Sequence, residues 1–149
     1  MSTTTPQVTL PRVGPASRRF GYVMAILVNA AMLFVANSVL DWGWPPFLTE
    51  DFGQVLWLID LSLLASIAVN SMYLGYDPPW FKSVCQIGLN LITIVVTIRM
   101  YQVFPFDFSA YEFNWEMLTR VVMVIGIVGT GIAIVVEFLK LARVAASPK

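Results

Sequence analysis

The 149-residue sequence contains no histidine and only one cysteine, Cys85. Haem held between histidines needs imidazole ligands, and zinc sites in proteins usually combine histidine and cysteine. A quinone-coupled disulfide oxidoreductase needs paired cysteines, which a single cysteine cannot supply. The usual haem, zinc and dithiol chemistries are therefore excluded, and we expect no metal and no cofactor.

Charged residues are also scarce. They make up 12% of the chain, whereas 58% of the residues are hydrophobic and the mean hydropathy is +0.75. A soluble domain typically carries about twice that share of charge, and one of this length could not bury so much apolar surface. The composition predicts an integral membrane protein. The nine basic and nine acidic residues give a net charge of zero, so the chain has no excess of positive charge that would attract nucleic acid.

Four apolar stretches are long enough to cross a bilayer, which takes about 20 helical residues. Proline-containing breakers separate them, and capping-box spacings occur at Asp51-x-x-Gln54 and Ser109-x-x-Glu112. The predicted helices cover about residues 20–40, 54–74, 81–104 and 110–141. We therefore predict an all-α integral membrane protein, a four-helix antiparallel transmembrane bundle. Its single domain covers about residues 18–143, between a flexible tail at 1–17 and a short tail at 144–149.

Seven basic residues lie outside the predicted spans or within two residues of a span end, and all seven lie on one side of the membrane. They are Arg12, Arg18, Arg19, Lys82, Lys140, Arg143 and Lys149. The first and third loops carry acidic residues and no cation. The positive-inside rule then predicts a multi-pass protein of the plasma (inner) membrane with both termini in the cytoplasm.

Aromatic residues crowd the two loops that are expected outside. The run from Phe104 to Ser109 alternates apolar and polar residues, so an extended segment would place its rings on one face. An interfacial aromatic belt explains this pattern. The alternative is a docking surface, or a cap over a cavity between the helices.

Ionisable residues inside the predicted spans are costly unless they are paired or hydrated. Asp60, Arg99 and Arg120 lie on three different helices at a predicted depth of roughly 7–9 Å below the outer boundary. We expect Asp60 to pair with Arg99, and Glu116 to pair with Arg120 at the i,i+4 spacing. This charge cluster is either a clamp that fixes helix packing or a site for an anion, a proton or a polar headgroup.

Polar residues follow one face of each predicted helix, and we expect these faces to form the bundle interior. They are Asn29 in the first span, Ser62, Ser66 and Asn70 in the second, and Gln86, Asn90, Thr93 and Thr97 in the third. In the fourth span, Gly126, Gly129 and Thr130 are predicted to allow close helix packing. Such residues either hydrogen-bond between helices or line a polar cavity. Glycines that face outward would instead mark a self-association surface.

The leading functional hypothesis is a non-enzymatic membrane protein that acts as an accessory or assembly subunit of a membrane complex, or as a homo-oligomeric scaffold. The alternative is a small oligomeric transporter or channel for an ion or small polar solute, which would use the Asp60, Arg99 and Arg120 layer. An enzyme acting on lipid or quinone is a third class, with Asp60 and Tyr101 or Tyr111 as its acid–base set. We expect the lipid bilayer as a partner, and a bound lipid is compatible with the sequence.

Overall fold

The computed structural model describes residues 11–147, and four long helices account for most of them. They are α1 (Pro15–Trp42), α2 (Gly53–Gly75), α3 (Pro79–Val103) and α4 (Trp115–Ala146), and a short 3₁₀ helix, η1 (Glu50–Phe52), leads into α2. Each long helix is long and apolar enough to cross a membrane. The prediction of an all-helical chain with four candidate membrane spans is confirmed.

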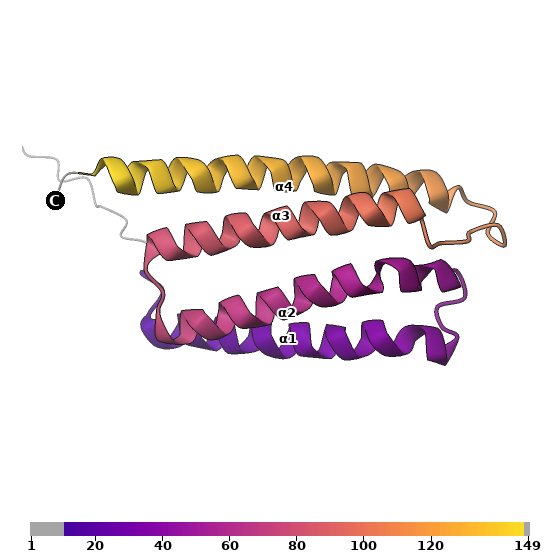
Figure 1. The fold of residues 1–149 in the computed structure, drawn as a ribbon, viewed down its shortest axis with the longest axis horizontal. Coiled ribbons are helices and arrows are strands. Elements are labelled where there is room, and N and C mark those ends of the chain that lie inside the picture. Colours follow the sequence, from indigo (N-terminus) through magenta and orange to yellow (C-terminus); the bar gives the residue numbers. More distant parts are fainter. Residues whose placement is uncertain (1–10, 148–149) are drawn as a thin grey trace, which may run out of the picture.

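The four helices lie side by side, and the chain reverses direction between consecutive helices (Figure 1). Helix α1 packs along α2, α3 packs along α4, and these two hairpins meet where α2 contacts α3. Within residues 11–147, no comparable contact joins α1 to α4. The arrangement is therefore open between its first and last helices.

The two ends of the helical array differ in composition, and we name them accordingly. The basic end holds the start of α1, the turn between α2 and α3, and the end of α4 (Figure 1). The aromatic end consists of the connecting segments 43–52 and 104–114 with the helix ends that they join.

Several helix boundaries differ from the predicted ones because local backbone chemistry decides them. Helix α1 begins at Pro15, whose missing N–H costs nothing in the first turn of a helix. It ends where Gly43 adopts the left-handed conformation with φ 62°. The last three residues of the predicted tail over 1–17 therefore belong to α1. Residues 1–10 lie outside the described part of the chain.

The fourth helix begins at Trp115 and not near residue 110. The Asn114 side chain accepts a hydrogen bond from the Met117 N–H at 3.1 Å and caps the helix. Ser109 caps no helix, since its own N–H is bonded to the Asp107 carboxylate at 2.9 Å in a local turn. At the other end α4 continues to Ala146, so the first three residues of the predicted tail at 144–149 are helical.

The Asp51 and Gln54 side chains bond to each other and do not cap α2. The Gln54 amide donates to Asp51 at 2.8 Å, and the residue at the N-cap position is Phe52. Few side chains of the described chain are buried: Phe52, Val55, Leu58, Tyr73, Ser83 and Pro105. Most apolar side chains face outward, which suits a lipid environment better than water.

Candidate functional site

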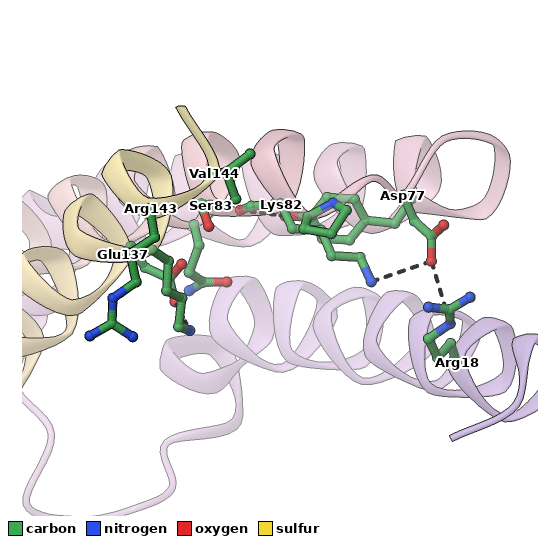
Figure 2. A pocket seen from close by; sticks show the side chains of 11 residues that line it. Arg18, Asp77, Lys82, Ser83, Glu137, Arg143 and Val144 are labelled. Atoms are coloured by element: carbon green, nitrogen blue, oxygen red, sulfur yellow. Dashed lines mark hydrogen bonds and ion pairs between the residues drawn. The ribbon is translucent and has the colours of Figure 1, made fainter. Parts of the chain in front are cut away.

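A cavity of about 570 Å³ lies at the basic end, and most of the residues that line it, from all four helices and the α2–α3 turn, are charged or polar. Figure 2 shows Arg18 of α1 and Lys82 of α3 converging on Asp77 in the turn, with Glu137 and Arg143 of α4 on the opposite side. Its volume falls within the range of about 300–1,000 Å³ that is common for small-molecule sites. This cavity is the candidate binding site in which charged side chains converge.

Asp77 is the centre of an ionic network in this cavity. Its carboxylate lies 3.3 Å from the Lys82 ammonium and 3.6 Å from the Arg18 guanidinium, and it accepts a hydrogen bond from the Tyr22 hydroxyl at 3.2 Å. The hydrogen bond from Lys82, with the nearby charges of Lys82 and Arg18, holds the pKa of Asp77 below its ordinary value. One carboxylate thus joins α1, the turn and α3.

Lys82 also contacts the aromatic rings of the first two helices. Its ammonium lies 5.1 Å from the centre of the Tyr22 ring and 5.9 Å from that of Tyr73, within reach of a cation–π attraction. The two rings are 5.3 Å apart, and the Tyr73 hydroxyl donates to the Lys82 carbonyl at 3.3 Å. These contacts fix Lys82 in the wall of the cavity.

Helix α4 supplies the opposite wall. Glu137 pairs with Lys140 at 2.7 Å, and Arg143 lies on the next turn. Sequence reasoning used Lys82, Lys140 and Arg143 only to orient the membrane and did not assemble them into a site. The missing information is tertiary: the short turn after Gly75 brings Asp77 to α1, and the extra length of α4 carries Arg143 alongside. The sequence feature that could have indicated this site is the concentration of both basic and acidic residues near three helix ends.

The structure distributes the predicted charge cluster over three separate contacts. Asp60 accepts a hydrogen bond from the Asn37 amide of α1 at 2.8 Å, and Arg99 donates to Gln102 of its own helix at 3.3 Å. No ion pair between Asp60 and Arg99 forms among the residues that the structure describes. The expected pairing of these two residues is therefore not formed, since Asp60 faces Asn37 of α1 and Arg99 contacts its own helix.

Glu116 and Arg120 do form the ion pair that their spacing favours, at 3.2 Å. The Arg120 guanidinium also lies over two rings at the end of α3, 4.1 Å from the centre of Phe104 and 4.9 Å from that of Tyr101. It donates a long hydrogen bond of 3.5 Å to the Tyr101 carbonyl. Arg120 therefore links α4 to α3.

The predicted interior polar residues bond mainly within their own helices. Six side chains donate a hydrogen bond to the backbone carbonyl three or four residues earlier: Asn29, Ser62, Asn70, Thr93, Thr97 and Thr130. Asn70 also donates to the Ser66 hydroxyl. Gln86 donates to Asn90 at 3.2 Å, one turn later. The side-chain amide nitrogen of Asn90 is buried without a partner among the described residues. Apart from this Asn90 nitrogen, the hydrogen bonds of these residues are local, and among the described residues none reaches a neighbouring helix.

Gly126 and Gly129 of α4 do not pack against another helix among the described residues. A methyl group added at Gly126 or Gly129 would meet open space. Both glycines are exposed, whereas Thr130 is half-buried. The glycine face therefore points away from α3.

The two connecting segments of the aromatic end are bonded to each other through their backbones. The Thr49 N–H donates to the Pro105 carbonyl at 3.0 Å, and the Asp107 N–H donates to the Phe47 carbonyl at 2.7 Å. The rings of Phe104, Phe106 and Phe108 lie within 6.4 Å of one another, as the alternating sequence predicts. A second, largely apolar cavity of about 460 Å³ lies here, lined by Phe47, Phe106, Phe108, Tyr111, Trp115 and Thr119.

Comparisons with known proteins do not place the chain in a family. The chain matches no protein-family model, no curated protein and no solved structure. Among residues 11–147, no group of three or more cysteine and carboxylate side chains is close enough to hold a metal ion. Functional inference therefore rests on the arrangement of the chain itself.

Proposed function

We propose that the chain is a non-enzymatic membrane protein that spans the plasma (inner) membrane four times and serves as a structural unit of an assembly. The assembly is a homo-oligomeric scaffold, or a larger complex in which the chain is an accessory subunit. Four apolar helices support the membrane location. The open side of the helical array supports the assembly role.

Charge distribution supports an orientation with the basic end in the cytoplasm. Arg18, Lys82 and Arg143 lie at this end, next to the start of α1 and the end of α4. The connecting segments 43–52 and 104–114 contain four acidic residues and neither lysine nor arginine. Because basic residues are retained on the cytoplasmic side, we propose that both termini lie in the cytoplasm.

The observation that carries the assembly proposal is the open face of α4. This helix buries none of its residues within the chain, and its two exposed glycines have free space beside them. Burial of apolar surface does not drive helices together in lipid, whereas close approach at small residues does. A face of this kind is completed by a helix of another chain, and a second α4 offers the same small residues.

Disulfide cross-linking in native membranes tests this proposal. In a Cys85→Ser background, we expect Gly129→Cys to give cross-linked dimers, because residue 129 is exposed beside the open glycine face. Ile127→Cys is the matched control at nearly the same depth, since residue 127 is half-buried and lies on another face of the helix. Equal cross-linking at both positions would indicate random collision.

Particle mass in mild detergent distinguishes the two forms of assembly. A homo-oligomeric scaffold gives an integral multiple of the 16.6 kDa chain. An accessory subunit gives co-purification of a larger membrane protein. A monodisperse monomer, together with no cross-link at position 129, would contradict the proposal.

A further inference from the structure

The cavity at the basic end carries more positive than negative charge. Four basic and two acidic side chains line it, which leaves two positive charges unmatched. The basic residues come from three different helices: Arg18 from α1, Lys82 from α3, and Lys140 and Arg143 from α4. The surplus is therefore concentrated around one space and not spread along one helix face.

Both carboxylates of the cavity are already neutralised by neighbours. Asp77 is paired with Lys82 and Arg18, and Glu137 is paired with Lys140. Arg143 forms no ion pair with any described residue, and Arg18 approaches Asp77 with its Nε atom. The end nitrogens of both guanidinium groups make no hydrogen bond to another part of the described chain. Because Arg18 and Lys82 share one carboxylate, one positive charge is left over there, and Arg143 supplies the second.

We propose that this cavity binds a phosphate group, carried by the headgroup of an anionic phospholipid or by a soluble phosphate. Planar guanidinium groups present paired N–H donors that match phosphate oxygens, and they stay charged at all physiological pH values. The Lys82 ammonium, held by Tyr22 and Tyr73, adds a fixed positive charge to the same space.

The surroundings of the cavity favour the phospholipid as the source. Val144 lines the cavity, and Val136 and Leu139 are exposed on the same stretch of α4. Apolar surface next to a basic pocket can hold acyl chains while the pocket holds the headgroup. Basic pockets between helix ends at the cytoplasmic surface are typical sites for anionic lipid headgroups. The inference does not depend on assembly, because the cavity lies within one chain.

Retention of lipid by the full chain tests the site. The protein is reconstituted with equal amounts of phosphatidylglycerol and phosphatidylcholine, extracted gently, and examined by native mass spectrometry. We expect selective retention of phosphatidylglycerol. Arg143→Gln should weaken this retention about fivefold, and the Lys140→Gln/Arg143→Gln double variant about 30-fold, since each basic residue near an anionic headgroup contributes on the order of 1 kcal/mol.

Matched controls remove the same charge from the same end without touching the cavity lining. Arg12→Gln and the Arg12→Gln/Arg19→Gln double variant alter exposed residues that do not line this cavity. They should retain phosphatidylglycerol as the parent does. An equal loss in the control and cavity variants would overturn the proposal, because the effect would then be one of overall charge.

Inorganic phosphate added to delipidated protein identifies the source of the bound group. Thermal stabilisation by phosphate that Arg143→Gln abolishes, without selective lipid retention, supports the cavity as a site for a soluble phosphate. Selective lipid retention that the cavity variants abolish supports the phospholipid. Neither lipid selectivity nor phosphate stabilisation in the parent would overturn the proposal.

Discussion

Each end of the molecule places one cation over two aromatic rings, yet the surrounding contacts differ. At the basic end, Lys82 lies over Tyr22 and Tyr73 and pairs with Asp77 in the turn. The turn itself is short, and its carboxylate also reaches α1 through Arg18. Contacts between elements at this end thus depend on charge.

At the aromatic end, Arg120 lies over Tyr101 and Phe104, and its carboxylate partner, Glu116, belongs to its own helix. The long connecting segments are joined by backbone hydrogen bonds and by packed rings. Contacts between elements at this end depend on apolar packing and backbone pairing. Salt and anionic ligands should therefore act mainly on the basic end and leave the contacts between elements at the aromatic end nearly unchanged.

The largest expected effect comes from removing a buried ring near the aromatic end. Phe52 is 8% exposed where η1 leads into α2. Phe52→Ala should lower the free energy of unfolding by about 3 kcal/mol, because it removes a buried aromatic side chain and leaves a cavity. Thermal unfolding in detergent micelles measures this loss, which should not change with salt concentration.

Phe113→Ala is the control for that substitution. Phe113 lies in the neighbouring connecting segment but is 59% exposed, so its loss should change stability by less than about 0.5 kcal/mol. Similar losses for Phe52→Ala and Phe113→Ala would contradict the view that buried rings hold this end together.

The elements of the fold that follow from local sequence could be predicted. The four spans follow from hydropathy, and the Glu116–Arg120 contact follows from the i,i+4 geometry of one helix. The start of α4 was predicted about five residues too early, because Ser109 and Asn114 are both good caps and sequence alone does not choose between them. The Asn114 cap decides the boundary once Asp107 has bonded to Ser109.

The contacts between distant segments could not be predicted in the same way. Equal depth suggested that Asp60 faces Arg99, yet depth says nothing about rotation around the helix axis, and Asp60 faces Asn37. The cavity at the basic end needs the turn at Asp77 and the last turns of α4 to meet. Its charges were visible in the sequence, whereas their convergence depends on how α3 and α4 pack.

A smaller effect is expected when each cation that lies over aromatic rings is replaced by the other basic residue type. Arg120→Lys keeps the charge but loses the planar group that stacks on Phe104, which should lower the free energy of unfolding by about 0.5–1 kcal/mol. Thermal unfolding at moderate salt measures the change. Arg120→Gln removes both the charge and the stacking group. If stacking is the main contact, Arg120→Lys should lower the free energy of unfolding by more than half of the amount that Arg120→Gln lowers it.

Lys82→Arg makes the reverse exchange at the basic end. Pairing with Asp77 needs only a positive charge, so this substitution should leave stability nearly unchanged. A loss as large as that of Arg120→Lys would show that shape, and not charge alone, matters at both ends.

The smallest effect is the response of the basic end to acid. Asp77 and its partners Arg18 and Lys82 have side chains that are at least 30% exposed, so water and salt weaken their attraction. Because Lys82 and Arg18 hold the pKa of Asp77 below its ordinary value, the folded protein binds this proton less tightly than the unfolded chain does. The stability from Asp77 is therefore fully present above about pH 4, the unfolded pKa, and is lost as the pH falls through the lower folded pKa.

Asp77→Asn should remove that acid-sensitive part of the stability, which thermal unfolding between about pH 3 and pH 6 measures. Asp107→Asn is the matched control at the aromatic end, where the hydrogen bonds from Ser109 hold the carboxyl pKa low without joining two helices. Both variants should flatten the acid limb of the curve, but only Asp77→Asn should also reduce the sensitivity of the protein to salt. If Asp107→Asn reduced it equally, the two ends would not differ in their dependence on charge, and the short turn at Asp77 would not be the electrostatic link between α1 and α3.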